Sequence, residues 1–159
     1  MALADTRFSN RRRKLASELA GQRIDAVVVT HLTHVRYLSG FSGSNGGLLL
    51  RKDLSALMAT DGRYTTQIAE EVPDLEAVLG RDVGPHLLST LQGELRVGYE
   101  ADYVSVSQLD RLKKAAPDGV TLVPVSGVIE KIRLVKDPIE LEKLEEIAAL
   151  ANQALTELV

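Results

Sequence analysis

The 159-residue sequence contains no cysteine. This absence excludes disulfide bonds, thiolate metal sites and cysteine nucleophiles together. The sequence also lacks any apolar run of the roughly 18 residues that a membrane-spanning helix needs. Its first 14 residues, MALADTRFSNRRRK, carry charge where a signal peptide has an apolar stretch. We therefore expect a cytoplasmic protein with no membrane partner, which the lack of cysteine also fits.

The sequence also has no excess of positive charge. The formal net charge is −3, so no overall field attracts nucleic acid or an anionic membrane. The one basic run, RRRK at Arg11–Lys14, falls within the first predicted helix. It could contact nucleic acid, but it is short and the chain is acidic overall, so we interpret it as a solvated helix face. We expect no nucleic-acid partner.

Along the sequence, segments with a strand pattern alternate with segments with a helix pattern. Strands are expected at 24–30, at two segments of 46–60 joined by a turn at Lys52–Asp53, and at 75–80, 95–100 and 120–125. Helices are expected from a cap at Ser9 or Asn10 to Gly21, at about 64–71, from Pro85 as the first helical position, and from a cap at Ser105 or Ser107. This order predicts a three-layer α/β domain with a mixed sheet of about six strands.

The last segment is predicted to form a longer amphipathic helix. Asp137 can cap it, Pro138 occupies its first turn, and Glu140 can reach back to the N–H of the cap residue. The apolar positions recur at spacings of three and four: Leu141, Leu144, Ala148, Ala151, Leu155 and Leu158. Because this pattern still runs at the final residue, we expect the helix to pack against a surface further along a longer chain. The alternative is a coiled-coil dimer.

The glycine-rich segment at residues 35–50, VRYLSGFSGSNGGLLL, could be a phosphate-binding loop or a turn. A P-loop needs a Lys-Ser or Lys-Thr pair after its glycines, and none is present. The glycines follow a G-x-x-G-x-x-G spacing, which differs from the dinucleotide fingerprint. A strand follows, so no helix N-terminus faces the loop. We predict a turn feeding a strand, with Asn45-Gly46 supplying a positive φ angle.

Two of the three histidines, His31 and His34, have the H-x-x-H spacing that can place both rings on one side of a helical turn. A metal site needs further ligands, and the sequence does not indicate which residues would supply them. We interpret the pair as polar residues at the exit of a strand, where Thr33 can cap a short helix.

The stretch TDGRY, at 60–64, contains a turn signal at Asp61-Gly62. Asp61 can also accept hydrogen bonds from the N–H groups that open the next helix. Arg63 and Tyr64 either anchor this turn by packing or an ion pair, or present a charged fork to a ligand. No Ser-His-Asp arrangement can be argued from spacing, because such groups converge only in the fold.

Three stretches in order resemble one family. Residues 35–50, the ATDGRY at 59–64 and the IEKIRLVKDPIELEKLEEIAALA at 129–151 are similar to the N-terminal part of creatinase/aminopeptidase P/prolidase proteins. The Xaa-Pro aminopeptidases and Xaa-Pro dipeptidases are the most similar members, and the resemblance runs from about Arg11 to the end of the chain. It implies a non-catalytic domain with a ribonuclease-H-like mixed sheet at 1–132. Residues 133–159 would then be a linker and the first helix of a truncated catalytic "pita-bread" domain.

The resemblance places the family's chemistry downstream of this chain. There, two aspartates, a histidine and two glutamates hold two divalent metal ions (manganese, cobalt or zinc), which activate a bridging water. None of these ligand positions has a match here, so we expect no catalytic residue and no metal in this chain. The implied partners are its own C-terminal catalytic domain, further copies in a dimer or tetramer, and short proline-containing peptides bound by the full-length protein.

The resemblance also suggests site residues. His34 stands where many members carry asparagine or aspartate; a carboxylate there could hold a substrate amine by its charge, whereas a neutral imidazole could only accept a hydrogen bond from that amine. The residues expected near substrate are His34, Arg36 and Tyr37, and those expected to be structural, with a share in a subunit interface, are Asp61, Arg63 and Tyr64. Two alternatives stay open: a creatinase-like or catalytically inactive relative, and a free-standing module that dimerises through its last helix.

Overall fold

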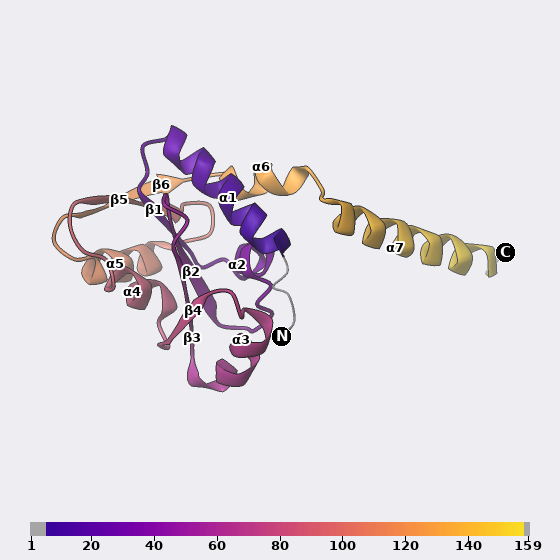
Figure 1. Cartoon of the computed structure of the whole chain (residues 1–159), viewed down its shortest axis with the longest axis horizontal. Coiled ribbons are helices and arrows are strands. Elements are labelled where there is room, and N and C mark those ends of the chain that lie inside the picture. Colours follow the sequence, from indigo (N-terminus) through magenta and orange to yellow (C-terminus); the bar gives the residue numbers. More distant parts are fainter. Residues whose placement is uncertain (1–5, 158–159) are drawn as a thin grey trace. The chain divides into compact units, whose positions relative to one another are not determined.

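The computed structural model describes residues 6–157. They form two compact units that divide between Ile129 and Glu130. In the first unit, helices cover both faces of a six-stranded mixed sheet (Figure 1). The predicted three-layer α/β architecture is confirmed. Within residues 6–157, no helix has the length and hydropathy that a transmembrane span needs.

All of the predicted strands are present. They are β1 (Ala26–Val29), β2 (Gly46–Arg51), β3 (Ala56–Thr60), β4 (Glu76–Leu79), β5 (Leu95–Glu100) and β6 (Val120–Val125). Their order in the sheet is β4-β3-β2-β1-β5-β6. The central β1 pairs antiparallel with β2 and parallel with β5, so the carboxyl ends of β1 and β5 meet at one edge of the sheet.

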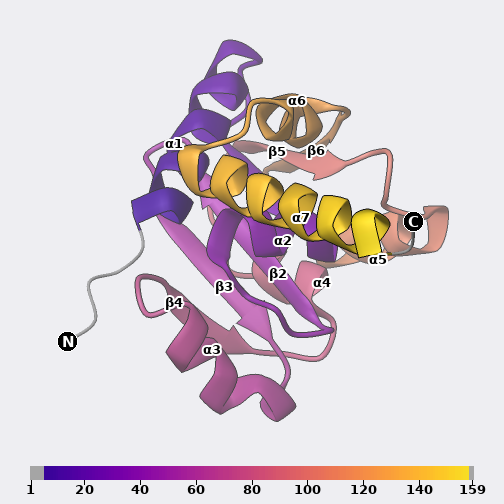
Figure 2. The same ribbon diagram turned by 90° about the vertical axis from the view of Figure 1, so that its right-hand side faces the viewer.

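The helices of the first unit form two layers. The bounds are α1 (Thr6–Gly21), α2 (Leu32–Ser39), the 3-10 turn η1 (Gly62–Tyr64), α3 (Thr65–Glu71), α4 (Val83–Leu88) and α5 (Val106–Ala115). Helices α1 and α2 pack on one face of the sheet, and α4 and α5 on the other (Figures 1 and 2). The remaining helices are α6 (Val128–Leu134) and α7 (Pro138–Glu157).

Several local predictions about helix ends were wrong. The first helix already includes Thr6. Pro85 is the third residue of α4, a position still within the first turn, where a missing N–H removes no intrahelical bond. The N-cap of α2 is His31 rather than Thr33. Helix α6 was not predicted at all.

The basic run in α1 also differs from the prediction. Arg11 and Arg12 are only 8% and 6% exposed, whereas Arg13 and Lys14 are exposed. The solvated-face interpretation is therefore wrong for the first two residues of the run. Helical geometry explains the division, because Arg11 and Arg12 lie on the same face as the buried Leu15.

These two buried arginines contact the end of α2. Arg11 Nη1 donates a hydrogen bond of 3.0 Å to the carbonyl of Tyr37, and its guanidinium lies 4.1 Å from the centre of the Tyr37 ring. Arg12 Nη1 donates one of 2.9 Å to the carbonyl of Leu38, and Arg12 also forms an ion pair with Asp74. The last carbonyls of a helix lack intrahelical donors, so α1 supplies donors to α2.

The glycine-rich segment is a turn that feeds β2, as predicted. The positive φ angle (87°), however, occurs at Gly40, the C-cap of α2, and not at Asn45-Gly46. The later glycines make room for an aromatic ring instead. A Cβ atom on Gly43 would lie 2.3 Å from a ring atom of the buried Phe41, and one on Gly46 would lie 2.8 Å from that ring.

Helix α7 begins with the predicted reciprocal cap. The Asp137 carboxylate accepts from the Glu140 N–H at 2.9 Å, and the Glu140 carboxylate accepts from the Asp137 N–H at 3.0 Å. No described residue of α7 is buried. The predicted apolar stripe is exposed at Leu141, Leu144 and Leu155, and Leu158 lies outside the described residues.

Candidate functional site

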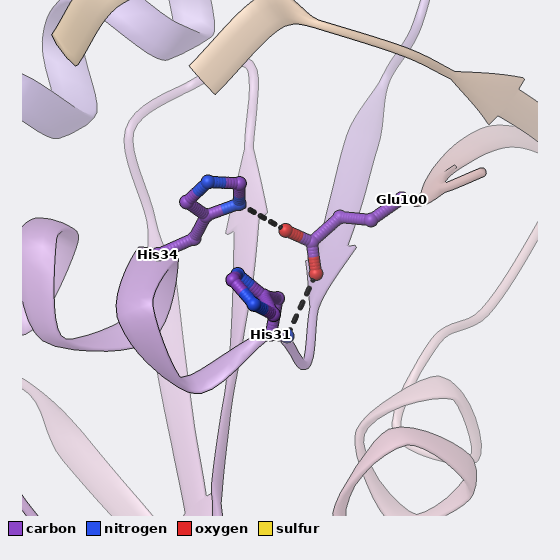
Figure 3. Close-up of side chains that lie close together, drawn as sticks. All are labelled: His31, His34 and Glu100. Carbon is purple, nitrogen blue, oxygen red and sulfur yellow. Dashed lines mark hydrogen bonds and ion pairs between the residues drawn. The ribbon is translucent and has the colours of Figure 1, made fainter. Parts of the chain in front are cut away.

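The strongest concentration of polar chemistry lies where β1 and β5 end. We call it the His34–Glu100 cluster, and it consists of His31, His34, Glu100 and Tyr103. His31 follows β1 and caps α2, and His34 lies in the first turn of that helix. Glu100 is the last residue of β5, and Tyr103 lies in the turn that follows. Figure 3 shows both histidines beside the Glu100 carboxylate.

Glu100 is the centre of this cluster. Its Oε1 lies 2.6 Å from His34 Nδ1, while its Oε2 accepts backbone hydrogen bonds from Thr30 (2.8 Å) and His31 (2.9 Å). His34 is 1% exposed and Glu100 is 6% exposed. A buried carboxylate needs such partners, because transfer from water otherwise costs several kcal/mol, on the order of the stability of a domain. The contacts fasten the start of α2 to the end of β5.

Tyr103 forms the outer side of the cluster. Its ring stacks on His31 with centroids 3.8 Å apart and an interplanar angle of 17°. The same ring meets His34 edge-on at 5.1 Å. Tyr103 is 41% exposed, so its ring contacts both histidines on one side and solvent on the other.

The cluster does not fit a dinuclear metal centre. One ligand atom from each of His31, His34 and Glu100 lies within 4.8 Å of the others. However, both carboxylate oxygens of Glu100 are already used by His34 and by two backbone N–H groups. A bridged pair of divalent ions needs several carboxylates. Among the described residues 6–157, this set of possible ligands contains one carboxylate, that of Glu100.

The three residues expected near substrate do not all lie on one side of α2. His34 and Tyr37, one helical turn apart, are both buried, the first against Glu100 and the second beneath Arg11. Arg36 is exposed. Of the three, only Arg36 presents its side chain to solvent in this unit. Their proximity to substrate stays a prediction.

Sequence reasoning missed Glu100 and Tyr103. The sequence carried only a weak signal for them: a glutamate at the end of one apolar strand and two histidines just after another. Carboxyl ends of neighbouring parallel strands meet at one edge of a sheet. Glu100 and His34 are 66 residues apart in the sequence, so the signal required knowing that β1 and β5 are neighbours.

A second polar network surrounds the Asp61 turn. As predicted, Asp61 caps the following turn by accepting from the Arg63 N–H at 3.1 Å. Arg63 also returns to the same carboxylate through Nε (2.9 Å) and Nη2 (2.8 Å), and Asn45 Nδ2 donates to it at 2.8 Å. The Arg63 and Asn45 donors hold the pKa of Asp61 well below its usual value of 3.8.

Tyr64 completes this network. Its hydroxyl lies 2.6 Å from the Ser44 hydroxyl, and its ring meets Phe41 edge-on at 5.7 Å. The turn is therefore joined to the glycine-rich segment on both its polar and its apolar side. Of the two interpretations of Arg63 and Tyr64, these contacts favour anchoring of the turn over presentation of a fork to a ligand.

Comparison with known proteins gives a family match over most of the chain. The sequence profile of the Creatinase/Prolidase N-terminal domain matches residues 11–135. A relative from Bacillus subtilis strain 168, described as the uncharacterized peptidase YqhT, is 34% identical over 137 residues. That alignment covers 82% of this chain and 37% of the relative. The chain thus spans little more than a third of that protein's length.

Solved structures give the same relationship. The N-terminal, Creatinase/Prolidase-like domain of a Corynebacterium diphtheriae protein described as a metallopeptidase is 60% identical, with a TM-score of 0.76, covering 77% of this chain and 98% of that one. The N-terminal domain of the cytoplasmic peptidase PepQ from Mycobacterium tuberculosis H37Rv is 43% identical (TM-score 0.74), with the same coverage. A Xaa-Pro dipeptidase from Bacillus anthracis is 25% identical (TM-score 0.81), covering 96% of this chain and 44% of that one.

Proposed function

This chain belongs to the Creatinase/Prolidase N-terminal domain family, and from that membership we propose that it is the non-catalytic N-terminal domain of a dinuclear metal-dependent peptidase acting on Xaa-Pro bonds, of the aminopeptidase P or prolidase type. One observation carries the proposal: the 60% identity to the N-terminal domain of a protein described as a metallopeptidase, over 98% of that domain. The His34–Glu100 cluster gives this chain no dinuclear metal site of its own.

Its first partner in this proposal is its own C-terminal catalytic domain. The B. anthracis dipeptidase aligns with 96% of this chain but with only 44% of its own length. The exposed apolar side chains of α7 suit a helix that packs against a further domain. In this proposal residues 1–132 are the N-terminal domain, residues 133–159 lead into the catalytic domain, and that domain holds two manganese, cobalt or zinc ions.

The domain's own contribution is assembly of a dimer or tetramer and restriction of the active site to short proline-containing peptides. His34, Arg36 and Tyr37 are the proposed substrate-proximal residues, and Asp61, Arg63 and Tyr64 support the fold or an interface. What supports a positioning role is the fixation of α2 at both ends, by Glu100 and by two arginines of α1. A cytoplasmic location is supported by the M. tuberculosis relative, which is described as a cytoplasmic peptidase.

The full-length protein and this chain should be assayed side by side. Each is loaded with Mn²⁺, Co²⁺ or Zn²⁺ and given a Xaa-Pro dipeptide, a Xaa-Pro-Xaa tripeptide and creatine. We expect metal-dependent cleavage of a proline peptide by the full-length protein and none by the chain alone. Hydrolysis of creatine instead would support the creatinase-like alternative, and a full-length protein inactive on every substrate would contradict the peptidase assignment.

The proposed substrate-proximal residues are tested in the full-length protein. Arg36→Ala and His34→Ala should each raise the KM for short proline peptides. Lys113→Ala is the control, because it removes an exposed cation that lies on α5 and not on α2. Unchanged kinetics in both α2 variants would remove α2 from the substrate path.

The alternative of a dimerising module has one observation in its favour, the exposed apolar stripe of α7. Sedimentation of this chain should be compared with that of a variant in which Leu141, Leu144 and Leu155 are serine. A dimer that dissociates on substitution supports the module, and a monomer in both cases contradicts it.

A further inference from the structure

A second site lies at the same edge of the sheet, on the side covered by α4 and α5. It is a cleft of about 330 Å³ between these helices, the end of β1 and the start of β2. Such crevices at the carboxyl ends of parallel strands are common ligand sites, and small-molecule pockets begin at about 300 Å³. The cleft is separate from the His34–Glu100 cluster, whose residues do not line it.

The walls of the cleft combine apolar and charged side chains. Leu32 is 40% exposed and supplies the apolar surface, while Val83 and Leu112 line the cleft as the outer part of the core. Arg81, Asp82 and Arg111 supply two positive charges and one negative charge. An ordinary solvated surface has mixed charges too, but it lacks a concave apolar wall between them.

The charged groups retain capacity for a ligand. Arg111 Nη1 lies 3.4 Å from Asp82 Oδ2, which is longer than the roughly 2.7–2.9 Å of a charge-assisted hydrogen bond. Both side chains are about half exposed, at 55% and 51%. Within residues 6–157, neither the Arg81 nor the Arg111 guanidinium donates a hydrogen bond to the protein.

We propose that this cleft binds a small zwitterion, a free α-amino acid or dipeptide with an apolar side chain. Its carboxylate would bind Arg111 and Arg81, since guanidinium forks suit carboxylates. Its ammonium group would face Asp82, and its side chain would lie against Leu32 and the edge of the core at Val83 and Leu112. The Asp82 carboxylate disfavours a polyanion such as phosphate. The ligand does not depend on the peptidase assignment, because the cleft's own charges define it.

The probe ligands are L-leucine, N-acetyl-L-leucine, which lacks the ammonium group, and L-leucinamide, which lacks the carboxylate. Binding to the ¹⁵N-labelled 159-residue chain is followed by chemical shifts of the backbone amides of Val83, Gly84 and Leu112. We expect saturable shifts with leucine and about tenfold weaker binding of each analogue, the equivalent of one lost ionic contact. Absence of saturable shifts with leucine, or equal binding of leucine and leucinamide, would overturn the proposal.

Variants identify the residues responsible. Arg111→Gln should weaken leucine about tenfold and remove its advantage over leucinamide. Asp82→Asn should weaken leucine while leaving N-acetyl-leucine unchanged. Arg13→Gln is the control, because Arg13 is an exposed arginine on α1, across the sheet from the cleft. If Arg111→Gln and Arg13→Gln bind leucine equally, the carboxylate is not recognised by the cleft.

Discussion

Replacement of Glu100 should release the start of α2 from β5. Its carboxylate accepts hydrogen bonds from the Thr30 and His31 N–H groups and pairs with His34 Nδ1. Glu100→Ala deletes all three contacts and leaves a buried imidazole facing a void. Glu100→Gln keeps an acceptor for the two backbone N–H groups but removes the charge that His34 faces.

The expected magnitudes follow from the number and type of these contacts. A hydrogen bond to a charged group contributes about 1.5–3 kcal/mol, and the half-buried positions of Thr30 and His31 favour the lower end. Glu100→Ala should therefore lower the free energy of unfolding by about 4–5 kcal/mol. Charge-assisted bonds are roughly twice as strong as neutral ones, so Glu100→Gln should cost about half as much, about 2–2.5 kcal/mol.

Urea unfolding of the 159-residue chain is the appropriate assay, with midpoints compared at equal slopes. A loss of about 5 kcal/mol can unfold a domain of ordinary stability, so Glu100→Gln is the quantitative variant. Glu94→Gln is the matched control, because Glu94 is exposed and immediately precedes β5. It should change the free energy of unfolding by less than about 0.5 kcal/mol. Equal stabilities of the two glutamine variants, together with a Glu100→Ala cost below about 1 kcal/mol, would refute the reasoning.

Three further predictions concern other parts of the first unit. Arg12→Met should lower the free energy of unfolding by about 2–4 kcal/mol, because it leaves the Leu38 carbonyl without its donor and the Asp74 carboxylate without its partner. Arg13→Met is the control and should leave the free energy of unfolding unchanged. Thermal or urea unfolding measures both variants. Gly43→Ala should destabilise by about 1–3 kcal/mol, because its methyl group would overlap the Phe41 ring; a near-native Tm would contradict this. Folding lowers the pKa of Asp61, so the interactions of its carboxylate stabilise the fold at pH values above its ordinary pKa of 3.8 and are lost as the pH falls below about 4. Asp61→Asn should therefore flatten the acid limb of a Tm-against-pH curve.

The fold was largely predictable because its strands carry strong local signals. Ala26–Val29 is a continuous apolar run, and all four of its residues are buried, as expected for a central strand covered on both faces. The errors fell where tertiary contacts override local pattern. Arg12 looks like a surface residue in its helix, and its burial depends on Asp74, 62 residues away. The sequence alone does not pair them.

The candidate site was predictable only in part, for the same reason. The H-x-x-H pair and the TDGRY turn were visible as motifs, and the capping role of Asp61 followed from local geometry. The partner of His34 did not, because Glu100 reaches it only through the parallel pairing of β1 with β5. Residues that act within one turn can be inferred from spacing, and residues joined across a sheet need the strand order.

The wrong prediction for Arg11 and Arg12 and the failure to find Glu100 share a physical cause. Helix α2 has eight residues, and isolated helices of that length are unstable in water. Its N-terminus is held by the Glu100 carboxylate and its C-terminus by Arg11 and Arg12, so each end receives the charge that complements the helix dipole. The buried charges are therefore explained by the shortness of the helix they hold. The exposed Arg36 therefore lies on a helix whose position is set by Glu100, Arg11 and Arg12.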